Sequence, residues 1–236
     1  MEAEKQITDF VDRLQQAAGG NLECIVLFGS AAADEFHADY SDINMLCIMR
    51  ELSSSILATL APAIQAWTRK RFSAPLIFSR TEFERSVDVY PIEMFDLSQR
   101  HRVLYGEDIF SGMRVPMERH RIQLEHSLRT KLLTLRQSYM QAVGDDKRIR
   151  RLMLDSVSTF STLFRHTLIA MGEPPAAHTA DNIRKLAELI KFDPGVYLQL
   201  LQVRERKAKE NQIDVATGFA KYIGGINAVI AAVDAL

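Results

Sequence analysis

The sequence has few cysteines and no long apolar run. Cys24 and Cys47 are the only two cysteines among 236 residues, which excludes a small disulfide-stabilised scaffold. Both lie in short apolar segments, where a buried thiol is the usual state, and this pattern fits a reducing cytoplasm. No apolar run approaches the roughly 18 residues that a membrane-spanning helix requires, and the acidic N-terminal segment lacks the pattern of a signal peptide. We therefore expect a cytoplasmic protein that does not enter a membrane.

Positive and negative charges nearly balance over the whole chain, but each half of the chain has a surplus of one sign. The formal net charge is −1 at pH 7, but residues 1–111 contain 10 basic and 17 acidic side chains, and residues 112–236 contain 19 and 13. This asymmetry and the chain length together predict two domains, 1–111 and 112–236. The basic segments 147–151 and 204–207 are too short for a nucleic-acid-binding face, which would also need interleaved aromatic residues.

Hydrophobic periodicity differs between the two predicted domains. The first contains both helical and strand-like segments. Helical spacing of apolar residues predicts helices over 3–18 and 53–71, and short apolar runs predict strands over 24–28, 43–49, 75–78 and 90–97. The second shows only helical patterns, separated by Gly, Asp and Pro, which predict helices near 117–143, 147–171, 180–191, 196–210 and 212–235. We therefore expect an α/β (α+β) domain with a small mixed sheet, followed by an all-α helical bundle.

A glycine and a serine, Gly29 and Ser30, follow the first predicted strand. Backbone N–H groups and a hydroxyl in such a turn can approach a phosphate group closely, because glycine has no Cβ. Eleven residues separate Ser30 from Asp42. Asp42 and Asn44 are two residues apart at the start of the next predicted strand, so their side chains project to one face. Oxygen ligands at this spacing suit a hard cation such as Mg²⁺.

A third acidic side chain from a neighbouring strand would complete a site for phosphoryl transfer. Glu93, in the predicted strand 90–97, is the best candidate, and Asp88 or Asp96 could take its place. His101 follows that strand closely. We interpret it as a surface histidine, with contact to a phosphate as the alternative.

These residues resemble the signature of the nucleotidyltransferase superfamily related to DNA polymerase beta, which includes the aminoglycoside nucleotidyltransferases. The resemblance covers roughly residues 22–97 and depends on the segments VLFGS, DIN and PIEMF. It implies transfer of a nucleoside monophosphate from an NTP to an acceptor hydroxyl, with Gly29 and Ser30 binding the nucleotide. It also implies divalent metal, Mg²⁺ or Mn²⁺, held by the catalytic residues Asp42, Asn44 and Glu93. The acceptor stays open, with a small molecule favoured over a protein side chain or an RNA end.

The sequence departs from this signature at Asn44, where the superfamily has a second aspartate. The Asn44 amide offers a carbonyl oxygen but none of the negative charge that offsets two close dications. A metal-dependent enzyme is therefore one hypothesis. The other is a protein of the same fold that has lost catalysis and acts as a nucleotide-binding, regulatory or interaction protein.

Overall fold

The computed structural model describes residues 2–29, 43–70 and 72–236. The chain divides into two compact units, Met1–Pro116 and Met117–Leu236, and each unit has its own core. Two of the predicted site residues, Ser30 and Asp42, lie outside the described residues.

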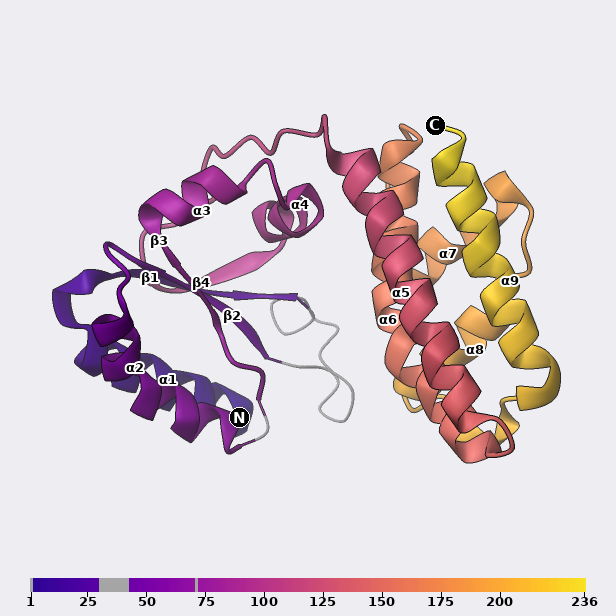
Figure 1. Cartoon of the computed structure of the whole chain (residues 1–236), viewed down its shortest axis with the longest axis horizontal. Helices are drawn as coiled ribbons and strands as arrows, with labels where there is room; N and C mark the ends of the chain where they lie inside the picture. Colours follow the sequence, from indigo (N-terminus) through magenta and orange to yellow (C-terminus); the bar gives the residue numbers. More distant parts are fainter. Residues whose placement is uncertain (1, 30–42, 71) are drawn as a thin grey trace. The chain divides into compact units, whose positions relative to one another are not determined.

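The first unit is built on a mixed four-stranded sheet with the strand order β3-β2-β1-β4 (Figure 1). The strands are β1 (Leu22–Phe28), β2 (Asn44–Met49), β3 (Leu76–Ser79) and β4 (His101–Gly106). β1 is antiparallel to both of its neighbours, β2 and β4, whereas β2 and β3 are parallel. The predicted small mixed sheet is therefore confirmed. Its helices are α1 (Glu2–Ala18), the short 3-10 helix η1 (Gly19–Asn21), α2 (Ser54–Thr68), α3 (Arg80–Ser86) and α4 (Pro91–Gln99).

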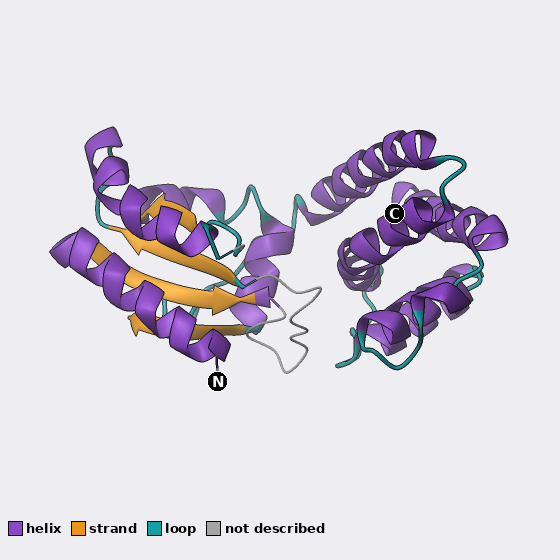
Figure 2. Cartoon of the chain, turned by 90° about the horizontal axis from the view of Figure 1, so that it is seen from below, coloured by secondary structure: helices purple, strands orange, loops and turns teal. Residues whose placement is uncertain are grey.

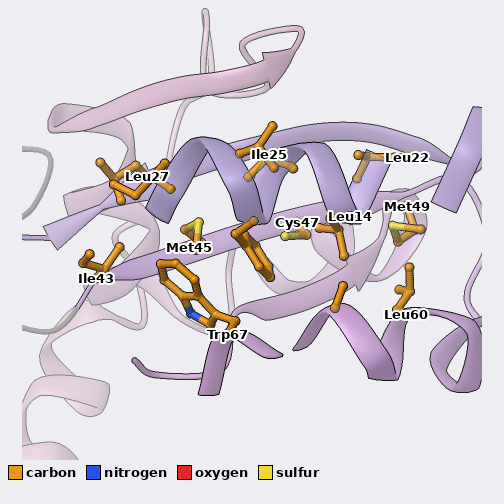
Figure 3. Packing of buried hydrophobic residues seen from close by; sticks show 14 residues of the cluster. Leu14, Leu22, Ile25, Leu27, Ile43, Met45, Cys47, Met49, Leu60 and Trp67 are labelled. Carbon is orange, nitrogen blue, oxygen red and sulfur yellow. The ribbon is translucent and has the colours of Figure 1, made fainter. Parts of the chain in front are cut away.

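One face of the sheet packs against α1 and α2. Side chains alternate along a strand, so Met45 and Cys47 of β2 both point to this face. They form one buried cluster with Leu14 of α1 and Trp67 of α2, shown from close by in Figure 3. The indole Nε1–H of Trp67 donates to the carbonyl oxygen of Ser73, so its polar atom is satisfied inside the core.

The opposite face packs against α3 and α4. Leu46 and Ile48 of β2 belong to a second buried cluster with Phe83 of α3 and with Met94 and Leu97 of α4. Because both faces of the sheet are covered, β1 and β2 are apolar along nearly their whole length, as the short apolar runs in the sequence indicated.

The strand predicted over 90–97 is wrong, because this segment is helix α4. Pro91 is at the start of the helix, where its fixed φ is favourable and its missing N–H costs nothing. Met94 and Leu97, three residues apart, then face the sheet together, whereas Glu93 is exposed. The fourth strand is instead β4, which follows directly, and helix α3 was also not predicted.

The second unit is all helical, and its five long helices confirm the predicted bundle (Figure 2). Two of them begin at aspartate caps: the Asp145 side chain accepts from the N–H of Arg148, and the Asp214 side chain accepts from the N–H of Ala216. The helices are α5 (His120–Ala142), α6 (Asp146–Ala170), α7 (Thr179–Ile190), α8 (Gly195–Arg204) and α9 (Val215–Asp234), with a 3-10 turn, η3 (Glu210–Gln212), before the last.

Helix α9 is unusually apolar. By length and composition alone it could cross a membrane, and it is the one such helix in the part of the chain that the structure describes. Its Phe219, Tyr222 and Ile226 are buried on one side, and Tyr222 packs edge-to-face on Phe160 of α6. In the structure this helix packs against α5 and α6 of the helical unit.

Candidate functional site

Three strands meet at the carboxyl end of β1. Phe28, the last residue of β1, is paired with Asn44, the first residue of β2, and with His101, the first residue of β4. Directly paired residues project to the same face of a sheet, and Phe28 packs on the cluster beneath α3 and α4. Asn44 and His101 therefore lie on that face, on either side of Phe28, at the point where Gly29 leaves the sheet.

Gly29 lies directly against the side chain of Asn44. Its φ is +75°, a conformation that side-chain-bearing residues rarely adopt, and a Cβ added to Gly29 would lie 3.1 Å from Nδ2 of Asn44. Asn44 is half-buried, and no hydrogen bond joins its amide to another described residue. The structure thus brings together two of the predicted site residues, Gly29 and Asn44.

The structure places Glu93 differently from the sequence prediction. It is an exposed side chain in the first turn of α4, not a member of a strand beside β2. Of the alternatives, Asp96 is half-buried on the same helix and Asp88 is half-buried just before it. Neither β3 nor β4 contains an acidic residue. The grouping of Asp42, Asn44 and Glu93 stays a prediction, because Asp42 lies outside the described residues.

A bound divalent metal needs several anionic or neutral oxygen ligands close together. Among the described residues, no group of three or more His, Cys, Asp and Glu side chains could hold a metal ion. The described donor beside Gly29 is the neutral amide of Asn44. On their own, therefore, the described residues do not form a metal site.

His101 was not predicted as a site residue, and the structure does not place it as a simple surface histidine. Its side chain is only 14% exposed, and its Nε2 lies 3.0 Å from Oδ1 of Asp108. The same Oδ1 accepts from the backbone N–H of Phe110 at 2.9 Å. The imidazole ring also contacts the ring of Phe110, with centroids 4.8 Å apart. A histidine held by a carboxylate therefore stands at the start of β4, beside the end of β1.

Comparison with known proteins supports the fold. No protein-family model and no curated protein sequence matches the chain. Among solved structures, the chain is similar to the spectinomycin adenyltransferase AAD(9) from Enterococcus faecialis, determined with ATP and spectinomycin. The TM-score is 0.62 at 14% sequence identity, and the match covers 98% of this chain and 99% of that one. At this identity the likeness shows the fold alone: this chain shares with that adenyltransferase a sheet unit followed by a helical unit.

Toxin–antitoxin structures also match, over about half of this chain. One is the Shewanella oneidensis complex of a tri-AMPylated HEPN toxin with the MNT antitoxin, at a TM-score of 0.30 and 14% identity over 58% of this chain and 98% of that one. Another is a toxin–antitoxin with AMP-PNP, at a TM-score of 0.33 and 16% identity over 53% of this chain and 97% of that one. These scores are too low to bear on the fold.

Proposed function

We propose that the chain binds a nucleoside triphosphate at the carboxyl end of β1 and transfers its nucleoside monophosphate to a hydroxyl of a small molecule. The observation that carries this proposal is the contact of Gly29 with Asn44 within a nucleotidyltransferase fold. AAD(9), which has the same fold, was determined with ATP and with spectinomycin. A nucleotide and a small hydroxyl-bearing acceptor are therefore the natural substrates to test first.

Each site residue has a role in this proposal. Gly29 and Ser30 bind the triphosphate through backbone N–H groups and a hydroxyl, which a Cβ at Gly29 would obstruct. Asp42, with Glu93 or a neighbouring acid, holds Mg²⁺ or Mn²⁺, and Asn44 adds a neutral oxygen. The metal would supply charge neutralisation for the phosphates. In phosphoryl transfer most of the acceleration comes from such neutralisation and from positioning.

Nucleotide binding can be tested without knowing the acceptor. Titration calorimetry with a non-hydrolysable ATP analogue, with and without MgCl₂, should show binding that strengthens with the metal. Asp42→Ala should weaken binding by about tenfold or more, or roughly 1.4 kcal/mol, and should remove the metal dependence. Asp12→Ala removes one exposed acid from α1 and is the matched control. Equal affinity in wild type and Asp42→Ala would contradict the proposed site.

A second candidate function is favoured by one observation, the neutral Asn44 at the position of a carboxylate. A protein of this fold that binds a nucleotide without transferring it would act as a regulatory or interaction protein. Pyrophosphate release from several NTPs, with spectinomycin as the first acceptor probe, separates the two. Release by the wild type supports transfer, whereas release only after Asn44→Asp identifies the natural chain as a binder.

The cellular location belongs to the same proposal. We infer a cytoplasmic protein, because Cys24 and Cys47 are free thiols and NTP substrates are cytoplasmic. They lie on opposite faces of the sheet, in separate clusters, so no disulfide joins them. Recovery of the protein outside the cytoplasm after fractionation of the cells that produce it would contradict this inference.

A further inference from the structure

The imidazole ring of His101 is held in a fixed orientation. Asp108 Oδ1 lies 3.0 Å from Nε2, and the Phe110 ring packs against the imidazole at a centroid distance of 4.8 Å. Phe110 is itself buried in the cluster beneath α3 and α4. One ring nitrogen and one ring face of His101 therefore have defined partners.

This contact determines which ring nitrogen carries a hydrogen. The Asp108 carboxylate oxygen already accepts the N–H of Phe110 and can only accept again. Nε2 of His101 must therefore be the donor. In the neutral ring the other nitrogen, Nδ1, is then a hydrogen-bond acceptor with a free lone pair.

Nδ1 of His101 is the unusual atom of this group. It is buried, and it has no hydrogen-bond partner among the described residues. An unsatisfied buried polar atom costs about 1–3 kcal/mol and calls for a specific reason. A donor supplied by a bound substrate would be such a reason, since His101 is paired with Phe28, the residue before Gly29.

Transfer to a hydroxyl also needs a group that removes the hydroxyl proton. The two strands that flank β1 and β2 at this end contain no carboxylate, and Asn44 cannot take a proton. His101 is the one group on β4 that can act as a base at neutral pH. It is also the first residue of that strand, level with Phe28.

We propose that His101 is the general base of the transfer and that Asp108 is its positioning residue. The O–H bond of the acceptor breaks as its proton passes to Nδ1 of His101. The oxygen forms a bond to the α-phosphorus, and the bond from that phosphorus to pyrophosphate breaks. Catalytic hydrogen bonds often form only once the substrate is bound, and the proposal requires the atoms that cover Nδ1 to shift on binding. This inference rests on the proposed function.

The test compares His101→Gln with wild type. Glutamine can keep a donor toward Asp108 but cannot take up a proton. We expect unchanged affinity for the ATP analogue and a loss of about 10²–10⁴-fold in pyrophosphate release with ATP, MgCl₂ and spectinomycin. His126→Gln, at an exposed histidine of α5, should behave as wild type.

The positioning role of Asp108 has its own test. Asp108→Asn keeps the shape but no longer fixes the ring tautomer, so kcat should fall while KM for ATP stays constant. The imidazole ¹⁵N shifts of His101 should show the hydrogen on Nε2 in wild type and a mixed state in Asp108→Asn. Hydrogen on Nδ1 in wild type would overturn the proposal.

The failures of the two proposals are distinguishable. If the wild type does not bind the ATP analogue, either with or without Mg²⁺, the proposed function is contradicted. Intact binding with an unchanged rate of pyrophosphate release in His101→Gln overturns the role of His101 as the base, but not the proposed function. If the wild type binds the ATP analogue but releases no pyrophosphate, both the proposed transfer and the role of His101 as its base are overturned. The chain is then a nucleotide-binding protein. A folded state of each variant is checked by the fluorescence of Trp67, the only tryptophan of the chain.

Discussion

Gly29 and Asn44 touch where β1 ends and β2 begins: a Cβ on Gly29 would lie 3.1 Å from Nδ2 of Asn44. Two separate physical requirements therefore select glycine here. The φ of +75° disfavours any side chain, and the Asn44 amide leaves almost no room for one. The first requirement concerns the stability of the turn. The second concerns the shape of the proposed phosphate site.

A pair of alanine variants separates these requirements. Gly112 has the same φ of +75° but nothing within 4 Å of its Cβ position. Gly29→Ala and Gly112→Ala should each lose about 1–2 kcal/mol of unfolding free energy from backbone strain. Only Gly29→Ala should also weaken binding of the ATP analogue, by about tenfold or more. Urea unfolding followed by Trp67 fluorescence, together with calorimetry, measures both effects. Equal nucleotide affinity in the two variants would remove Gly29 from the site.

Gly106, the last residue of β4, has even less space for a side chain than Gly29, because it packs directly against the backbone of β1. A Cβ there would lie 1.8 Å from the carbonyl oxygen of Glu23, and the φ is +77°. No small shift of a side chain can relieve a clash with backbone, so the pairing of β1 with β4 must open. We expect Gly106→Ala to lose about 3–5 kcal/mol of unfolding free energy, against about 1–2 kcal/mol for Gly112→Ala. A loss no larger than that of Gly112→Ala, in the same urea titration, would contradict the close packing at Gly106.

The helices of the second unit were predictable because caps and periodicity agree with the tertiary packing. The same holds for α2, where the side chain of Ser53 caps the helix by accepting from the N–H of Ile56. The strand prediction for segment 90–97 was wrong for a physical reason. Ile92 and Met94 are two residues apart with Glu93 between them, as on one face of a strand, whereas Pro91 and the packing of Leu97 select a helix. Short apolar segments are ambiguous in this way, since both periods fit them.

The candidate site was predictable where two strands that follow one another in the sequence also pair in the sheet. Gly29 and Asn44 meet because β1 and β2 form an antiparallel pair joined by one connection. Glu93 was placed on a strand because the sequence pattern of segment 90–97 wrongly predicted a strand there. His101 was named from the sequence as a surface histidine or a phosphate contact, but its pairing with Asp108 could not be predicted, because Asp108 reaches it only after the chain reverses beyond Gly106. No periodicity in the sequence shows that reversal.

The cap of α9 predicts a pH dependence. The pKa of Asp214 is lowered below its ordinary value, first by the hydrogen bond from the Thr217 hydroxyl, then by the backbone N–H groups of Thr217 and Ala216. A lowered pKa in the folded state contributes stability above the unfolded value, near 3.9, and this stability is lost as the pH falls through the lowered value. The thermal midpoint of wild type should therefore decrease as the solution is acidified below about pH 4.

Asp214→Asn is the matched variant for this effect. Asparagine also caps helices, so the cap remains, but the side chain no longer titrates. The variant should lose less stability than wild type over the same acid range, measured by circular dichroism of the helices. Other acids have lowered pKa values too, among them Asp193, so the difference between the two proteins is the relevant quantity. Parallel curves would show that Asp214 contributes nothing to the acid sensitivity.

His120 and His166 join α5 to α6 inside the helical unit. Nε2 of His120 lies 2.8 Å from Nδ1 of His166, and the two residues are 3% and 0% exposed. One ring must donate and the other accept, so replacing one leaves a buried polar atom without this partner. We expect His120→Leu or His166→Leu alone to cost about 1–3 kcal/mol each. The double variant should cost less than the sum, with a coupling energy of about 0.5–3 kcal/mol.

Urea unfolding of the four proteins in this cycle, followed by far-ultraviolet circular dichroism, measures the coupling directly. A second cycle that combines His166→Leu with His126→Leu provides the comparison, because His126 is exposed on α5 and is not bonded to His166. The second cycle should be additive, since distant sites without shared partners do not couple. If the His120–His166 cycle is additive as well, each ring is satisfied by its other contacts. The hydrogen bond between the rings would then not be what holds α5 against α6.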